Sequence, residues 1–166
     1  NGGRGEKTTS LSLNRATDTT RQPGSTFKIL SSFAPAIDLY GATLASTYYD
    51  SEYTLGKKTF KNWYSGGYLG FQSIRDGIVY SLNIVAVRCL IDTVKVENGF
   101  RYAESLGITS LVPEDANPAL ALGGLTRGVS NLEMTQAFSV IANKGRFQKA
   151  KFFSKIEDQN GKVIID

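Results

Sequence analysis

A serine and a lysine three residues apart are the residues in this chain whose types and spacing most directly suggest chemistry. In "RQPGSTFKIL" (residues 21–30), Ser25 follows a Pro-Gly turn and Lys28 begins an apolar run. On one helix face, the lysine amine can take the serine proton if burial or nearby positive charge lowers its pKa from about 10.4. The hydroxyl then becomes a nucleophile, and free N–H groups of the first helical turn stabilise an oxyanion. The simpler alternative is a helix cap worth about 1 kcal/mol.

A second motif, Ser81-Leu82-Asn83, lies on the turn between two predicted helices. There a hydroxyl and a carboxamide can both point into a cleft, where the hydroxyl relays a proton and the carboxamide holds a substrate amide. The same pattern occurs in Ser12-Leu13-Asn14, within the alternating, strand-like stretch "SLSLN". Ser81 is the better candidate because it lies between helices.

The composition excludes several classes of catalytic site and metal site. The chain has no histidine and a single cysteine, Cys89, which excludes a Ser-His-Asp triad, a disulfide framework and metal sites built on histidine or cysteine. We expect no metal and no cofactor. The net charge of +4, from 19 basic and 15 acidic residues, is too mild to indicate a nucleic-acid partner. The basic stretch from Lys144 to Lys155 is interpreted as a solvated strand edge.

Helices are the elements that must position these residues. A helix is predicted from Ser25 to a stop at Gly41, with Pro35 expected to kink or shorten it. The other predictions are a short helix ending near Tyr80, a buried helix over 83–94, a short helix over 99–107, and a helix over 130–145 with a Ser130–Glu133 capping box.

Strands are predicted mainly at the C-terminus, where residues 152–166 form a hairpin around Asn160-Gly161. Residues 1–23 are expected to hold a strand end and a loop. Residues 41–70 show no period and are predicted to be a functional loop. Its aromatic residues either wall a groove or pack the loop itself, and Thr126 and Arg127 either face the cleft or serve their own loop. The aromatic residues are Trp63, Tyr64, Tyr68 and Phe71.

Three segments together resemble penicillin-binding protein transpeptidases of the class A (bifunctional) type. "LNRATDTTRQPGSTFKIL" (13–30) is similar to their active-site segment, and "YSLNIVAVRCL" (80–90) to their second motif. "ALGGLTRGVSNLEMTQAFSVIANKG" (121–145) looks like their later core helix and its preceding loop. The resemblance implies an α/β fold of the penicillin-binding protein and serine β-lactamase-like transpeptidase type. Here it is represented mainly by its helical part plus a C-terminal β-hairpin.

The resemblance also implies roles for individual residues. Ser25 attacks the carbonyl between two terminal D-alanines of a peptidoglycan stem peptide, with Lys28 as its base. Ser81 passes the proton to the leaving D-alanine, and Asn83 binds the substrate and keeps Lys28 in place. Thr126 is a candidate substrate-binding residue. An amine acceptor then completes the cross-link, and β-lactams acylate the same serine. The expected location is the extracytoplasmic face of the bacterial cell membrane, with an anchor outside this chain.

One motif of the family is missing. No K-T-G occurs in the 166 residues, and the nearest strings, "EKTTS" and "KKTFK", both precede Ser81. Because a lone hairpin is not a stable sheet, we expect residues 1–166 to be a partial transpeptidase domain. The remaining sheet strands, with K-T-G, would lie in a separate or missing segment. We therefore expect the chain alone to be inactive and unstable.

Three other functions remain open from the sequence. A serine β-lactamase needs a deacylating water, yet the E-x-x-x-N pattern of class A lactamases is absent after Ser81. A penicillin-sensing receptor domain would be acylated without cross-linking anything. In a non-catalytic α/β module, Ser25 would be only a cap.

Overall fold

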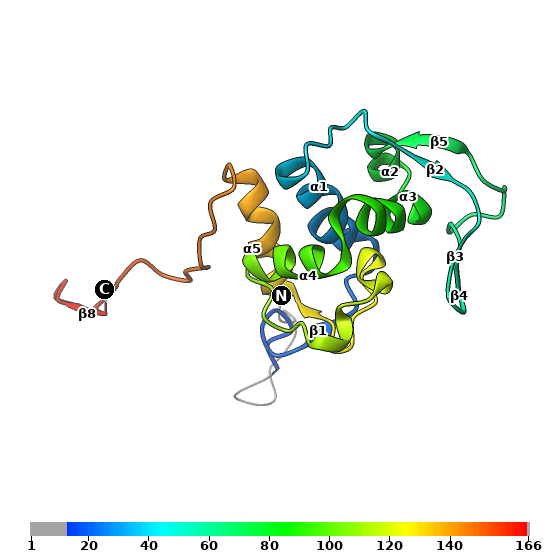
Figure 1. Ribbon diagram of the computed structural model, residues 1–166. Coiled ribbons are helices and arrows are strands. Elements are labelled where there is room, and N and C mark those ends of the chain that lie inside the picture. Colours follow the sequence, from blue (N-terminus) through cyan, green and yellow to red (C-terminus); the bar gives the residue numbers. More distant parts are fainter. Residues whose placement is uncertain (1–12, 166) are drawn as a thin grey trace.

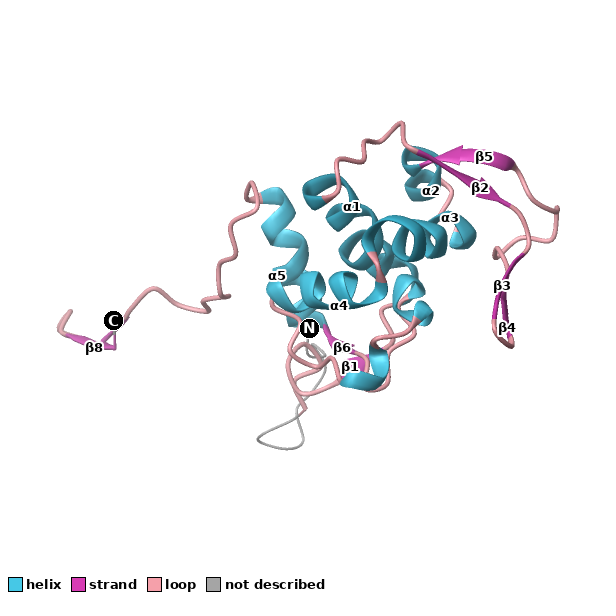
Figure 2. Ribbon diagram, in the orientation of Figure 1, coloured by secondary structure: helices cyan, strands magenta, loops and turns pink. Residues whose placement is uncertain are grey.

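The computed structural model describes residues 13–165, and most of them form one helical body (Figure 1). A ribbon of short strands projects from one side of this body, and the segment after the last helix extends away on the other side (Figure 2). Ser12 of the alternative S-x-N string lies outside the described residues, as does the start of the predicted N-terminal strand.

The helix that begins near Ser25 is continuous but irregular. A 3₁₀ turn, Gly24–Thr26, leads through a π-helical turn, Ile29–Phe33, into α1, Ala34–Leu39. Pro35 has no N–H to donate, and the wide turn just before it absorbs this defect. The helix therefore passes the proline and ends before Gly41, whose φ of 67° suits only glycine without strain.

The other predicted helices are confirmed, with shifted ends. They are α2 (Ile74–Val79), α3 (Asn83–Arg88) with a π-helical continuation (Cys89–Val94), α4 (Val96–Ser105) and α5 (Asn131–Ala142). Two 3₁₀ turns, Pro113–Asp115 and Pro118–Leu122, connect α4 to the strand before α5. The Ser130–Glu133 capping box begins α5.

The helices pack around α3, every turn of which is buried as its apolar sequence predicts. Ile84, Val85, Ala86 and Val87 are all inaccessible to solvent. Phe27, Leu30 and Phe33 of the first helix and Ile74 of α2 join this core. The packing of the first helix against α3 fixes the distance between the two sequence motifs, which lie at the beginnings of these helices.

The prediction that residues 41–70 form a loop without strands is wrong. Strands β2 (Thr47–Asp50) and β5 (Gly70–Ser73) pair antiparallel, and β3 (Tyr53–Leu55) pairs with β4 (Lys58–Phe60) between them. The two-residue loop Gly56-Lys57, with glycine at φ 57°, is a hairpin signal that the sequence offered. The β2–β5 pairing is long-range and carries no local signal. A further pair joins β1 (Thr20–Arg21) to β6 (Val129–Ser130).

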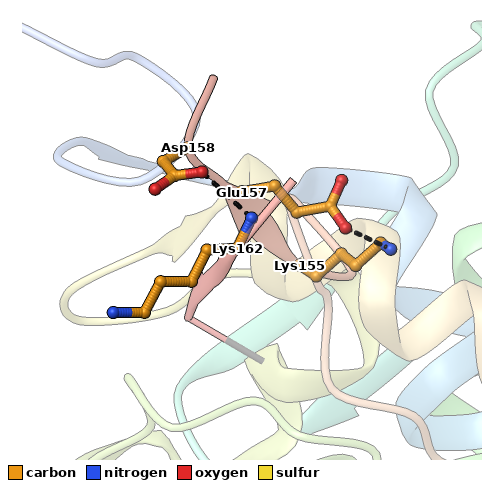
Figure 3. A network of polar contacts seen from close by, with 4 residues as sticks. All are labelled: Lys155, Glu157, Asp158 and Lys162. Atoms are coloured by element: carbon orange, nitrogen blue, oxygen red, sulfur yellow. Dashed lines mark hydrogen bonds and ion pairs between the residues drawn. The ribbon is translucent and has the colours of Figure 1, made fainter. Parts of the chain in front are cut away.

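The C-terminal hairpin is confirmed as β7 (Ile156–Glu157) and β8 (Val163–Ile165). Its loop runs from 158 to 162, and Asp158 Oδ1 accepts a hydrogen bond from the Lys162 N–H (Figure 3). The same oxygen accepts from the Asn160 N–H. Lys155 pairs with Glu157 beside it. The basic stretch 144–155 precedes β7 as exposed loop, so its interpretation as a strand edge is wrong. Among the described residues, no helix is long and apolar enough to cross a membrane.

Candidate active site

The turn that carries Ser25 is held by the loop after the second 3₁₀ turn. A Cβ on Gly123 would lie 2.3 Å from the carbonyl oxygen of Gly24, so only glycine allows this approach. The Gln22 carboxamide donates to the Leu125 carbonyl and accepts from the Leu125 N–H at 2.8 Å, as a strand would. These contacts place the exposed Ser25 side chain at the start of the helix. No local pattern in the sequence indicates this role of Gln22.

Lys28 is the amine of the site whose pKa is shifted most. It is 2% exposed, and its Nζ donates to Ser81 O at 2.6 Å, Asn83 Oδ1 at 2.7 Å and Ser81 Oγ at 2.9 Å. Burial lowers the pKa of Lys28 from 10.5 to about 8. A substantial fraction of this amine is therefore neutral near physiological pH, as a general base requires.

The partners of Lys28 suit a neutral amine. A neutral amine has two N–H donors and one lone pair, and the Ser81 carbonyl and Asn83 Oδ1 can take the two donors. The Ser81 hydroxyl can either accept from the amine or turn and donate to its lone pair. The arrangement thus tolerates both protonation states and links Lys28 to Ser81 by a path for a proton.

Ser81 lies in a strained turn that aims both of its polar groups at Lys28. Its φ is 52°, in the left-handed region that glycine usually occupies. The Leu82 N–H bonds to Gly77 O at 3.0 Å and the Ser81 N–H to Ile78 O at 3.4 Å, which is the Schellman pattern at the end of α2. Glycine would adopt this backbone conformation with less strain. A serine at this position bears the strain but places a hydroxyl there.

Asn83, the first residue of α3, is held so that its oxygen faces the lysine. Its Nδ2 donates to Lys61 O at 2.8 Å, which leaves Oδ1 for Lys28. Two side chains of the second motif and one of the first therefore meet, although 53 to 55 residues separate them in the chain.

Ser25 and Lys28 do not touch directly. No hydrogen bond joins their side chains in the described structure, because the amine turns toward Ser81 and Asn83 instead. The two residues nevertheless lie on consecutive turns of one helix, with Ser25 exposed and Lys28 buried behind it. Catalytic hydrogen bonds are often long or absent without substrate, so the lack of this bond does not rule out Lys28 as the base for Ser25.

Thr126 is tied to its own loop. Its N–H and hydroxyl both donate to Asp115 Oδ1, and Asp115 is buried. The same residue also lines an open cleft of about 590 Å³, together with Gln22, Lys58, Ala119 and residues 122–125. The hydrogen bonds to Asp115 favour a role of Thr126 in supporting its own loop. Contact of Thr126 with the substrate stays a prediction.

Three of the four aromatic residues make defined contacts, and the fourth, Tyr68, is exposed. Trp63 is 71% exposed, and its Nε1 donates to Tyr80 O at 3.0 Å, next to Ser81. Phe71 is 73% exposed and packs edge-on against Tyr49 on the β2–β5 ribbon. Tyr64 is half-buried and bonds to Asp50 and Asn62. Only Trp63 is thereby fixed beside the second motif. In residues 13–165 no cluster of three or more histidine, cysteine or acidic side chains could hold a metal ion.

Comparison with known proteins identifies the family. The family model for the penicillin binding protein transpeptidase domain matches residues 3–165. Penicillin-binding protein 1F of Bacillus subtilis is 40% identical over 162 residues, which cover 98% of this chain and 22% of that protein. Penicillin-binding protein 1A of Clostridium botulinum (strain Hall) is 34% identical over 181 residues, covering 99% of this chain and 21% of that protein.

Solved structures agree with this assignment. Penicillin-binding protein 1A from Haemophilus influenzae superposes with a TM-score of 0.79 at 31% identity, covering 92% of this chain and 22% of that chain. The protein PonA1 from Mycobacterium tuberculosis, solved in complex with penicillin V, shares the fold with a TM-score of 0.77 at 22% identity. The match covers 94% of this chain and 43% of the PonA1 chain. The chain spans about a fifth of the length of the curated relatives it matches.

Proposed function

The chain belongs to the penicillin-binding protein transpeptidase family, and from this membership and the site geometry we propose that it supplies the nucleophile half of a serine D,D-transpeptidase. The substrate is a peptidoglycan stem peptide ending in D-Ala-D-Ala, and the second substrate is an amine on a neighbouring strand. The buried Lys28 amine, bonded to both polar residues of the second motif, is the observation that carries the proposal.

Acylation begins when Ser25 Oγ gives its proton to Lys28 Nζ and attacks the carbonyl carbon between the two D-alanines. The carbonyl oxygen becomes an oxyanion, which the Ser25 N–H at the helix start stabilises. The proton then passes from Lys28 through the Ser81 hydroxyl to the leaving amine. The C–N bond breaks, D-alanine departs, and an ester joins the remaining peptide to Ser25.

The second half of the reaction reverses these transfers. The acceptor amine attacks the ester carbonyl and loses one proton to the Ser81–Lys28 pair. The C–O bond of the ester breaks, and the proton returns to Ser25 Oγ. A new amide bond remains as the cross-link. Asn83 holds the substrate amide through both steps while its Oδ1 keeps Lys28 in place.

Other parts of the enzyme complete the site in this proposal. A strand with K-T-G, which these 166 residues lack, supplies a second oxyanion donor and binds the substrate carboxylate. Residues 1–166 then form part of a transpeptidase domain on the extracytoplasmic face of the cell membrane, held by an anchor elsewhere in the protein. β-Lactams are inhibitors because they acylate Ser25 and the ester persists.

Intact mass after incubation with a fluorescent penicillin tests the proposal. The chain joined to a K-T-G segment should gain one penicillin mass, and Ser25→Ala should gain none. Ser105→Ala is the matched control, because Ser105 is an exposed helix serine whose hydroxyl binds only Tyr102 O, and it should be labelled like the unchanged chain. Labelling that survives Ser25→Ala would refute the assignment of the nucleophile.

Two further assays separate the related functions. Steady turnover of nitrocefin instead of a single burst would indicate a β-lactamase. Stable acylation with no transfer of the peptide to an added amine would indicate a penicillin-sensing receptor.

A further inference from the structure

We propose that Asn62, fixed by the buried carboxylate of Asp50, is a positioning residue that orients Asn83 toward the Lys28 amine. The inference rests on the proposed function, because it concerns the geometry of that same site. Neither residue belongs to the S-x-x-K or S-x-N motif, and both come from the β2–β5 ribbon segment that looked like an aperiodic loop.

Asn62 caps helix α3 from outside the helix. Its Oδ1 accepts from the Asn83 N–H at 2.9 Å and from the Ile84 N–H at 3.3 Å. The residue in the usual capping position, Leu82, has no side-chain oxygen to do this. The free N–H groups at the start of α3 therefore depend on a side chain 21 residues earlier in the chain.

Asp50 decides which way the Asn62 amide points. The Asp50 side chain is 1% exposed, and its Oδ1 accepts from Asn62 Nδ2 at 2.8 Å. Its Oδ2 accepts from the Tyr64 hydroxyl at 3.2 Å and the Leu69 N–H at 2.9 Å. The Asp50 oxygens act as acceptors and the α3 N–H groups as donors, so Asn62 presents its NH₂ group to Asp50 and its oxygen to α3.

The next residue along the chain completes the alignment. With Asn62 anchored, the neighbouring Lys61 carbonyl accepts from Asn83 Nδ2 at 2.8 Å. Asn83 is then held at its backbone by Asn62 and at its NH₂ group by Lys61, which leaves Oδ1 for Lys28 at 2.7 Å. Rotation of the Asn83 amide by half a turn would place an NH₂ group against the lysine amine and remove an acceptor.

Asp50 acts on the site through this chain of hydrogen bonds and not through an ion pair with Lys28. The direct partners of Lys28, Ser81 and Asn83, are uncharged. In the described part of the chain the lysine has no ion pair, since the single pair there joins Lys155 to Glu157. Loss of Asn62 should therefore misplace the base while the nucleophile and the binding cleft stay intact.

Acylation kinetics of the chain joined to its K-T-G segment test the inference. For Asn62→Ala we expect the rate constant of acylation to fall about 10- to 100-fold, as small misplacements of catalytic groups do, while the dissociation constant of the penicillin changes little. Asn98→Ala is the matched control, because the Asn98 side chain is likewise bonded to the backbone of a helix, donating to Val94 O at 2.8 Å, and among the described residues it has no hydrogen bond to the site. It should keep the full acylation rate.

An exchange of the two side chains separates positioning from general stability. In the double variant Asp50→Asn with Asn62→Asp, the new amide donates to the new carboxylate, whose other oxygen still accepts from Asn83 and Ile84. We expect each single variant to be acylated slowly. The double variant should recover at least half of the loss in the logarithm of the acylation rate constant.

The outcomes are distinguishable even if Asn62→Ala does not fold. A folded Asn62→Ala protein with the full acylation rate would overturn the inference, and so would a folded double variant as slow as the single ones. Thermal unfolding shows which variants are folded. Labelling that persists in Ser25→Ala would instead overturn the proposed function itself.

Discussion

At the scale of single residues, Lys28 shows two opposing effects on one amine. Burial penalises the charged form and lowers the pKa to about 8, whereas the three oxygen neighbours can satisfy an ammonium group. The desolvation effect is the larger one, because none of those oxygens carries a full charge. The result is an amine that can exchange its proton near the working pH of the cell.

This balance predicts a pH dependence for acylation. The neutral fraction of Lys28 grows as the pH rises through about 8, so the acylation rate of Ser25 should rise there and level off above it. The unfolded lysine keeps its proton up to 10.5, so this group's contribution to the unfolding free energy also increases with pH between about 8 and 10.5. Stopped-flow labelling with a fluorescent penicillin from pH 6 to about 10 measures the rate.

The Asn83→Asp variant supplies the check on this assignment. A carboxylate at the position of Asn83 Oδ1, 2.7 Å from the amine, stabilises the ammonium form, so the rise should move to higher pH. A profile that stays at the same pH in Asn83→Asp would mean that Lys28 is not the group that titrates.

At the scale of elements, the site depends on two helix starts and the turn between α2 and α3. The capping-box serine of α2, Ser73, and that of α5, Ser130, each bond to an acidic residue three positions on. Helix α3 has no such box and takes its cap from Asn62 instead. The end of α2 uses Ser81 where glycine would be less strained. Both departures from the ordinary pattern occur next to Lys28.

A Ser81→Gly variant separates stability from chemistry in this turn. Glycine relieves the left-handed strain, so the unfolding free energy should increase by about 1 kcal/mol. The same change removes the hydroxyl that we propose relays the proton, so acylation should slow by about 100-fold or more. Urea unfolding and penicillin labelling measure the two quantities.

Ser81→Ala is the matched control because it loses the hydroxyl but keeps the strained backbone. It should acylate as slowly as Ser81→Gly and be less stable than that variant. Equal labelling rates for Ser81→Gly and the unchanged protein would show that the hydroxyl is dispensable.

At the scale of the whole molecule, apolar surface is unevenly distributed. The helical body buries most of its large aliphatic residues, although Leu39 and Val79 are exposed. By contrast, β8 exposes Val163, Ile164 and Ile165, and the segment before the hairpin exposes Phe152 and Phe153. The hairpin is two-stranded and extends away from the helices (Figure 1). Such a pair is marginally stable without further strands or a packed face. This surface suits the proposal that more sheet pairs with it.

We therefore expect the chain alone to bind a hydrophobic dye such as ANS, and the chain joined to a K-T-G segment to bind much less. Burial of these side chains against added strands is the physical reason. Fluorescence titration at equal protein concentration measures the difference, and replacing Val163 and Ile165 with Ser in the chain alone is the control that should lower its signal. Equal dye binding with and without the segment would contradict this account of the hairpin.

The sequence by itself determined the helices and the residues that could take part in a reaction. Apolar periodicity and caps act over a few residues, so the helices around Lys28, Asn83 and Ser130 were predictable, as were the two motifs and the resemblance they carry. The resemblance already implied that Asn83 keeps Lys28 in place. Only the tertiary structure decided that the Ser81 carbonyl also binds Lys28, that β2 pairs with β5, and that Asp50 and Asn62 support α3. These contacts join residues far apart in the chain, and no local propensity encodes them because they arise when helices and strands pack together.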